Sequence, residues 1–354
     1  MNMKLNFNFA RVLGRPNPIG LDIGARHVKA VQLAPSGGGA WRVAATAMFP
    51  RAKSGQPLDA PEAARVAEVL DRQGFAGRAV VVGMPQAKLM SSVLELPPRA
   101  PGVPIEQIAR MELARVHGRD AGGFEFAQWE VPPPARAPQS THVMALACAH
   151  ESAEALLDAL ESQGLIVRAI DADACALARA LAPLLDASGG MTGVLDLGYG
   201  AARLLIVYRG AIVYTRAIDD AGMARLNANL RRQLEADEDT VAQLLAEDFF
   251  SGTAPEESRG IVAAHFDALL KELHVAFAYA TQQYSVPSPA GLLLAGGGAE
   301  MPGVADRLAA ALRLPVRTAA PNALIDCGAS APRAAASASM TTALGLAMYS
   351  EARA

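Results

Sequence analysis

Aromatic residues are scarce in this sequence. Its 354 residues include ten Phe, six Tyr and two Trp, too few and too scattered for a platform on which nucleic-acid bases stack. The sequence also has no large excess of either charge sign, because its 32 basic and 35 acidic residues give a formal charge of −3. A balanced surface gives no electrostatic reason to expect a nucleic acid or an anionic membrane as the main partner.

Cysteine is rare too. Cys148, Cys175 and Cys327 lie far apart and show no CxxC spacing, which indicates buried free thiols rather than a metal site or a disulfide framework. No apolar run reaches the roughly 20 residues of a membrane-spanning helix. The opening stretch MNMKLNFNFARVLGRPNP carries charges and Asn where a signal peptide needs an unbroken apolar segment. We therefore expect a cytoplasmic protein without a membrane span of its own.

What the sequence does contain is an internal repeat. Residues 19–29 read IGLDIGARHVK and residues 193–203 read GVLDLGYGAAR, and both place Asp, an aliphatic residue and Gly at the end of an apolar run. In each half the turn leads into two further strands, predicted at 27–33 and 41–49 and again at 202–208 and 211–218. A repeat of this length predicts two similar subdomains that face one another.

Hydrophobic periodicity and turn residues predict the remaining elements. The stretches PPPARAPQS and 329–339 are predicted as loops. Further strands are expected at 78–85, 91–97, 124–131, 141–149, 165–171 and 291–298, and helices at 61–74, 105–118, 151–164, 173–185, within 220–248, and at 259–284, 302–312 and 341–349.

The repeated turns suit a phosphate ligand. An Asp at a strand end can hold a hydrated Mg²⁺, and Gly lets the backbone approach a phosphate and present its N–H groups. A third glycine loop, GLLLAGGGAEMPG, enters a helix and can admit a flat base beside a phosphate. Each motif alone is a weak signal, whereas the three in this order, each at a strand end, form a strong one.

These three motifs resemble the two phosphate motifs and the adenosine motif of the actin/Hsp70/sugar-kinase superfamily. The surrounding sequence is similar, over about residues 18–350, to the PilM family of type IV pilus assembly, and the cell-division family FtsA is a relative. The segments that carry this resemblance are IGLDIGARHVKAVQL, PIEQIARMELAR, FEFAQWEV, LACAHESAEALLDALESQGLIVRAIDADACALARAL, VYTRAI, GLLLAGGGAEMPG and TTALGLAM.

The resemblance implies an α/β, actin-like fold with two duplicated RNase H-like lobes and an inserted subdomain of the FtsA/PilM type. The expected parts are an N-terminal extension (1–17), the first lobe (18–85 and 166–190), the insertion (86–165), the second lobe (191–218 and 289–354) and a helical subdomain of that lobe (219–288).

The resemblance also implies ATP and Mg²⁺ between the lobes, with the metal held through water. It further implies a groove for the N-terminal cytoplasmic tail of a PilN-like inner-membrane protein, which would place the chain at the inner membrane through its partner. Helix 105–118 and strand 124–131 are the predicted groove walls. By position, Asp22 and Asp196 would face the metal, Gly24, Gly198 and Gly200 would shape the phosphate turns, Lys29 would lie beside the first turn, and Gly296, Gly297 and Gly298 would line the nucleoside.

The sequence departs from the family pattern at the turns. Where hydroxyl residues are usual, the first turn has Ala25, Arg26 and His27, and the second has Ala201 and Ala202. Each lost hydroxyl removes about 0.5–1.5 kcal/mol of net hydrogen bonding. Arg26 either offsets this loss by binding a phosphate or is a solvated turn residue.

Two further departures concern acidic residues. Asp219 and Asp220 replace a Gly-Gly pair and are predicted to cap a helix. Glu106, Glu112 and Glu130 fit solvated positions, so no general base for ATP hydrolysis stands out.

Several functions remain open from the sequence. The first is a scaffold in which ATP is a structural ligand or a switch. The alternatives are an ATPase or small-molecule kinase of the superfamily, a polymerising filament protein, and the equivalent subunit of another pilus or type II secretion system.

Overall fold

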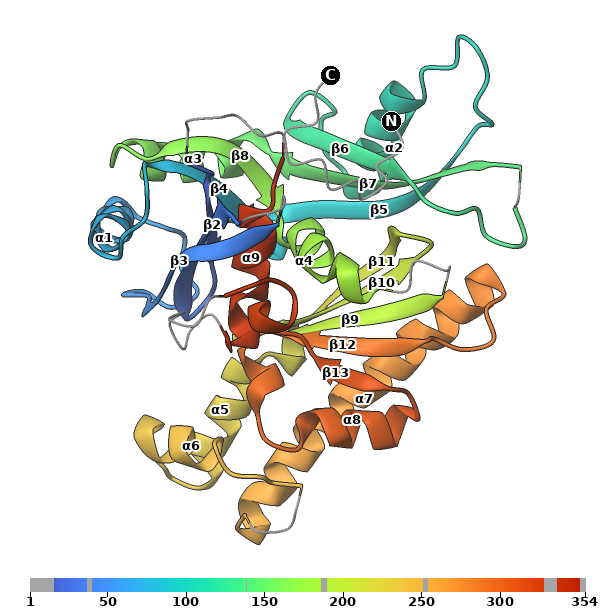
Figure 1. The fold of residues 1–354 in the computed structure, drawn as a ribbon. Coiled ribbons are helices and arrows are strands. Elements are labelled where there is room, and N and C mark those ends of the chain that lie inside the picture. Colours follow the sequence, from blue (N-terminus) through green and yellow to red (C-terminus); the bar gives the residue numbers. More distant parts are fainter. Residues whose placement is uncertain are drawn as a thin grey trace.

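Two five-stranded sheets frame the protein (Figure 1). The computed structural model describes residues 16–36, 40–137, 139–185, 190–250, 254–327 and 336–350. The sheets have the same strand order and the same pattern of parallel and antiparallel pairs, so the predicted duplication is confirmed. The first sheet runs β3 (Trp41–Pro50), β2 (His27–Pro35), β1 (Ile19–Ile23), β4 (Ala79–Met84), β8 (Ile166–Ala172), and the second runs β11 (Ala211–Ile218), β10 (Ala202–Tyr208), β9 (Met191–Leu197), β12 (Gly291–Ala295), β13 (Val316–Thr318).

The central strands of both sheets are covered on both faces. Every residue of β1 and β12 is buried, which explains why these strands read as nearly continuous apolar runs. Asp22 lies near the end of β1, and Asp196 lies near the end of β9, the matching strand of the second sheet. A carboxylate at such a position needs a partner, because burying an unpaired charge is costly.

Two helices, α4 (Asp173–Leu181) and α9 (Thr341–Ala347), lie between the sheets (Figure 1). They cross so closely that a Cβ atom at Gly345 would lie only 1.8 Å from the carbonyl oxygen of Ala176. In the same way, a Cβ atom at Gly20 in β1 would lie 2.2 Å from the carbonyl oxygen of Ala343. Glycine at these crossings therefore lets one central layer join the two lobes.

The helices outside the insertion belong to the two lobes. The helices α1 (Ala60–Arg72) and α3 (His150–Glu161) share a core with the first sheet, in which Val66 and Leu160 pack near Leu21. Although α3 falls within the range 86–165 predicted for the insertion, it therefore packs with the first lobe. The second lobe carries α5 (Met223–Gln233), α6 (Glu238–Leu244), α7 (Glu256–Tyr284) and α8 (Val304–Leu312).

The insertion is a small sheet of three antiparallel strands, ordered β5 (Leu89–Leu96), β7 (Thr141–Ala149), β6 (Phe124–Glu130). The helix α2 (Ile105–His117) packs on one face and forms a core with it. The other face joins the core of the second lobe, where the indole Nε1 of Trp129 donates a hydrogen bond of 3.1 Å to the carbonyl of Ile212. Because Cys148 of β7 also shares a core cluster with Met84 of β4, the insertion contacts both lobes.

Most predicted elements agree with the structure to within a few residues, with two exceptions. The short strand β13 has no counterpart in the prediction. The predicted helix cap at Asp219 and Asp220 is wrong, since these residues form a 3₁₀ turn and Gly222 is the N-cap of α5. Most of the predicted loop 329–339 lies outside the described residues.

Candidate functional site

Each sheet presents one carboxylate paired with one cation. In the first sheet, Asp22 in β1 lies directly opposite Lys29 in β2, and the lysine Nζ is 2.7 Å from the Asp22 Oδ2. In the second sheet, Asp196 in β9 lies directly opposite Arg203 in β10, and the arginine Nη1 is 3.7 Å from the Asp196 Oδ2. The cation follows the aspartate by seven residues in both halves. The duplication therefore extends from the strands to the charges at their ends.

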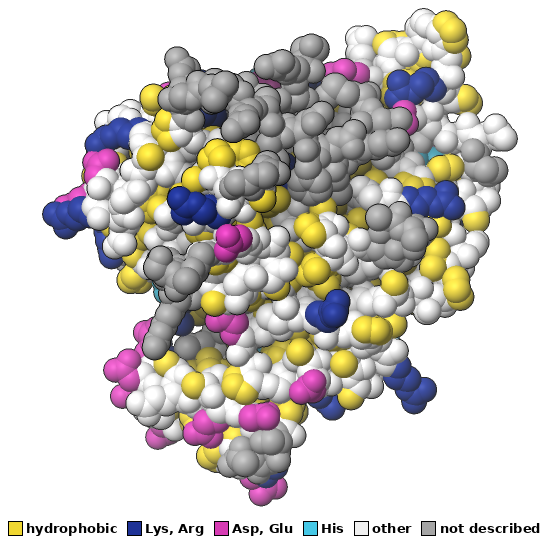
Figure 2. All heavy atoms as spheres, viewed as in Figure 1, with side chains coloured by type: hydrophobic (Ala, Val, Ile, Leu, Met, Phe, Trp, Pro, Cys, Tyr) yellow, Lys and Arg dark blue, Asp and Glu magenta, His cyan; other side chains and the backbone are white. Residues whose placement is uncertain are grey.

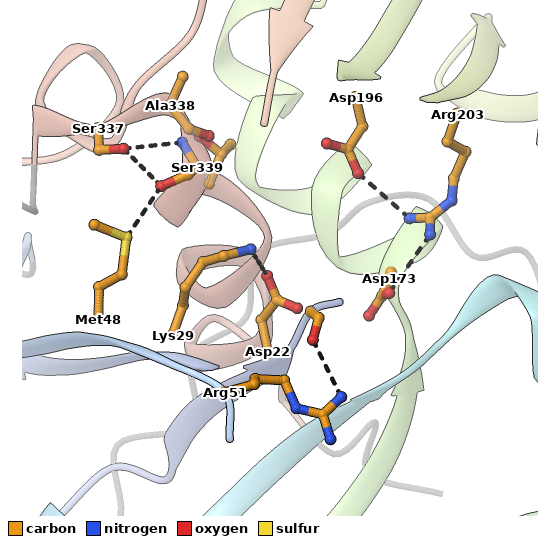
Figure 3. A network of polar contacts seen from close by, with 12 residues as sticks. Asp22, Lys29, Met48, Arg51, Asp173, Asp196, Arg203, Ser337, Ala338 and Ser339 are labelled. Carbon is orange, nitrogen blue, oxygen red and sulfur yellow. Dashed lines mark hydrogen bonds and ion pairs between the residues drawn. The ribbon is translucent and has the colours of Figure 1, made fainter. Parts of the chain in front are cut away.

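A third carboxylate joins the two pairs. Asp173 is the first residue of α4, and its Oδ2 lies 3.6 Å from the Nη2 of Arg203 (Figure 3). It fits against β4 because a glycine stands there, since a Cβ atom at Gly83 would lie 2.1 Å from the Asp173 Oδ1. Figure 3 shows the Asp22–Lys29 pair facing the group formed by Asp173, Asp196 and Arg203. None of these five side chains is more than 17% exposed.

Burial and mutual repulsion disfavour the anionic forms of two of these carboxylates. Burial raises the pKa of Asp196, while Arg203 and Lys29 oppose that shift. Burial also raises the pKa of Asp173 to about 7, opposed by Arg203 and reinforced by the charges of Asp22 and Asp196. A carboxyl group that titrates near neutral pH is a frequent mark of a functional site.

The lysine stays charged in the same environment. Burial lowers the pKa of Lys29, but the charge and hydrogen bond of Asp22 and then the charges of Asp196 and Asp173 raise it above its usual value. The two lobes therefore share one electrostatic cluster of three carboxylates and two fixed cations.

The guanidinium of Arg203 has unused donors. Its Nε and Nη1 atoms are buried and have no hydrogen-bond partner among the described residues. A buried donor without an acceptor is unfavourable, and the fork of a guanidinium matches the oxygens of a phosphate or carboxylate. The site thus fits an oxyanion that would accept these hydrogen bonds.

The two predicted phosphate turns approach one another. A Cβ atom at Gly200 would lie 3.2 Å from the Cβ of Ala25, across the boundary between the lobes. A Cβ atom at Gly198 would lie 2.7 Å from the carbonyl oxygen of Ala201, so the second turn is too tight for a side chain there. The first turn closes on itself, because the Gly24 N–H donates to the His27 carbonyl at 3.0 Å.

The third glycine loop crosses over Asp196. Gly296 has a φ of +82°, and a Cβ atom there would lie 2.3 Å from the Asp196 Oδ1. Gly298 is packed against Met223 and Leu197, whereas a Cβ atom at Gly297 would meet no atom within 4 Å. Of the three predicted nucleoside-binding glycines, Gly297 alone faces open space.

Arg26 joins the two lobes at the surface. Its guanidinium lies 5.1 Å from the ring centre of Tyr199 in the second turn, and its Nη2 is 3.1 Å from the Oε1 of Glu238 in α6. Figure 2 shows acidic side chains over the region of α6, where Asp237, Glu238 and Asp239 are exposed. The predicted choice between a phosphate contact and a solvated turn therefore omitted a third role, an ion pair between the lobes.

A buried ion pair supports the first turn. Arg51 binds Glu62 through Nη2–Oε2 at 2.5 Å and Nε–Oε1 at 3.1 Å, and its Nη1 donates to the Gly24 carbonyl at 3.4 Å. Sequence reasoning missed this pair, and also Asp173 and Arg203. Superposing the two repeats would have found Arg203, because it takes the place of Lys29.

The helix predicted as a groove wall turns its apolar residues into the protein's own core. Ile105, Ala109 and Leu113 of α2 are buried in the core beneath that helix. Met111 and Val116, which the helical pattern also assigned to the apolar face, are exposed. The strand β6 is an edge strand, and such a strand presents unpaired N–H and C=O groups to an added strand.

Two kinds of site are not found in the described part of the chain. No group of three or more Asp, Glu, His or Cys side chains is placed to hold a metal ion directly. No described helix is both long enough and apolar enough to cross a membrane. The predicted contacts of Asp22 and Asp196 with the waters of a metal ion stay a prediction.

Comparisons with known proteins agree with this architecture. The family model "Type IV pilus assembly protein PilM" matches residues 20–351. The solved "PilM-PilN type IV pilus biogenesis complex" is similar with a TM-score of 0.78 at 20% identity, covering 94% of this chain and 98% of that one. The ethanolamine utilization protein EutJ from Carboxydothermus hydrogenoformans is similar with a TM-score of 0.54 at 16% identity, covering 96% of this chain and 92% of that one. No curated protein sequence gives a significant match. The predicted actin-like fold is confirmed.

Proposed function

Because the chain belongs to the PilM family of type IV pilus assembly proteins, we propose that it is an actin-like scaffold that binds ATP between its lobes and a membrane protein on its insertion. The partner is the N-terminal cytoplasmic tail of a PilN-like inner-membrane protein, which holds the chain at the cytoplasmic side of that membrane. The similarity of this chain to the solved PilM–PilN complex, over 94% of this chain and 98% of the matched chain, supports this pairing.

The duplicated charge pairs are the observation that carries the nucleotide proposal. Lys29 and Arg203 approach the same space from the two sheets, and the unused donors of Arg203 need an acceptor. The phosphates of ATP would lie between them, close to the turns at Gly24, Gly198 and Gly200, with the nucleoside toward Gly297.

We propose that ATP acts as a structural ligand or switch rather than as a substrate consumed at a high rate. Asp173 is a carboxyl group with a near-neutral pKa in this site, but its Oδ2 pairs with Arg203. Because this pairing engages the oxygen, we assign Asp173 to the charge cluster and not to the role of general base. Measurement of phosphate release tests this point, and turnover above about 1 s⁻¹, the low end of ordinary enzyme rates, would contradict it.

For the partner, we propose that the tail binds at the edge of β6. Main-chain hydrogen bonds to an exposed edge strand give affinity, and side-chain pockets add specificity. Fluorescence anisotropy with a labelled tail peptide of the PilN-like protein should show saturable binding that a scrambled peptide lacks. Failure to bind at millimolar peptide would overturn the partner proposal.

Hydrogen exchange then locates the bound peptide. Binding at the edge should slow exchange in residues 124–130, while β13, an edge strand of the second sheet, serves as the control and should not change. Saturable binding without protection of β6 would keep the partner and refute this location.

A further inference from the structure

Arg203 occupies the same place in the second sheet that Lys29 occupies in the first. Both lie on the second strand of their sheet, opposite the aspartate that ends the first strand. A ligand between the lobes therefore meets a fixed positive charge from each side. Nothing in the predicted nucleotide motifs required the second of these charges.

The carboxylates that would hold the waters of Mg²⁺ are already engaged. Asp22 binds Lys29 at 2.7 Å, and Arg203 lies within 3.7 Å of both Asp196 and Asp173. A divalent cation at this place would have to compete with these two tethered cations for the carboxylates. It would also find no group of ligands for direct coordination among the described residues.

The unused donors of Arg203 require an acceptor, which a metal ion is not. Its Nε and Nη1 are buried without a hydrogen-bond partner, although the guanidinium lies at ion-pair distance from two carboxylates. A phosphoryl oxygen would accept hydrogen bonds from this fork. Hydrogen bonding thus favours an anion, rather than a cation, beside Arg203.

We propose that Lys29 and Arg203 together neutralise the phosphates of the bound nucleotide, so that this protein binds ATP without needing a divalent metal. The proposal rests on the proposed nucleotide function and deepens it by naming what compensates the phosphate charge. It replaces the predicted role of Asp22 and Asp196 toward Mg²⁺ by a role in orienting the two cations. A purely structural Arg203 would brace the lobes and would not change the metal dependence of binding.

The test is calorimetric titration of the full chain with ATP, once in excess MgCl₂ and once in EDTA. The wild-type dissociation constants should agree within about threefold, which is less than 1 kcal/mol. Arg203→Gln, which keeps a polar side chain but removes the charge, should weaken binding in EDTA by about 10- to 100-fold, as expected for lost charge-assisted hydrogen bonds. In MgCl₂ the loss should be smaller, because the metal then supplies the missing charge.

Two further variants separate this role from a structural one. Arg203→Lys keeps the charge and should restore much of the binding in EDTA. Arg216→Gln makes the same change on the neighbouring strand, where Arg216 pairs with Glu272 at the surface, and should leave the ratio of the two dissociation constants unchanged.

The outcomes distinguish this inference from the proposed function. Wild-type affinity that falls more than about tenfold in EDTA refutes the inference and leaves the nucleotide site in place. Equal metal dependence of wild type and Arg203→Gln refutes the role of Arg203. If ATP binds in neither buffer, the nucleotide site itself is refuted and the inference falls with it. Should Arg203→Gln fail to fold, the wild-type ratio still decides.

Discussion

Removing Arg51 should destabilise the protein more than removing one residue of an exposed ion pair. Arg51 and Glu62 are 4% and 3% exposed and share a two-pronged ion pair, and the Ala52 N–H donates to the same carboxylate at 3.0 Å. Burial raises the pKa of Glu62, but the hydrogen bonds and charge of Arg51, with the Ala52 N–H, lower it below its usual value. Glu62 is therefore ionised and depends on its partner.

Arg51→Met leaves that carboxylate buried without a counterion, which should cost about 3–5 kcal/mol of unfolding free energy. The double variant Arg51→Met/Glu62→Met removes both charges and should be less destabilised than the single variant, because well-packed apolar residues often replace a buried pair without loss. Urea unfolding of the wild type, both single variants and the double variant measures the coupling between the two positions.

Lys53→Met provides the matched control, since Lys53 pairs with Asp59 close by but is 64% exposed. It should cost less than about 1 kcal/mol. The reasoning fails if Arg51→Met costs no more than this control, or if the double variant loses as much as the two single variants together.

Three further predictions concern other parts of the fold. His265 is 8% exposed, and its Nε2 has no hydrogen-bond partner among the described residues. Burial lowers the pKa of His265, a backbone hydrogen bond opposes this shift, and the charge of Arg225 adds to it. Stability should therefore fall as the pH drops below about 6.5, by at most about 1.4 kcal/mol per pH unit from this group, and thermal melts should show a shallower fall in His265→Gln. Trp129→Phe removes the hydrogen bond to the Ile212 carbonyl and should cost about 1–3 kcal/mol in urea unfolding; no loss would mean that the insertion is not held there. Glu238→Gln should change the unfolding free energy by less than about 1 kcal/mol, because Glu238 and Arg26 are 55% and 39% exposed; a larger change would make this contact a main link between the lobes.

The sequence was most informative where structure is local. The two Asp-x-Gly turns, the strands that follow them and the glycine loop at 296–298 were placed correctly, because buried strands and tight turns impose their pattern on neighbouring residues. The repeat predicted two similar subdomains, and the two sheets indeed share one strand order. Gly297 and Gly298 could not be distinguished from the sequence. In the structure, a Cβ atom at Gly297 would meet open space, whereas one at Gly298 would meet Met223 and Leu197.

The missed features depend on contacts between distant residues. Asp173 enters the site only because α4 starts beside β4 and β10, and Trp129 contacts Ile212 only because the insertion folds back onto the second lobe. The strand β13 has three residues and no buried one, so its sequence carries no apolar alternation. The wrong helix cap at Asp219 arose because capping residues also suit a 3₁₀ turn.

If the protein works as proposed, both repeats close on one nucleotide. Hydrogen exchange of the full chain, measured with and without ATP, reports on both turns in one experiment. We expect slower exchange at 22–29 and at 196–203 together, with protection that rises with ATP concentration along a single binding curve. Protection of only one turn, or of neither at saturating ATP, would contradict this proposal.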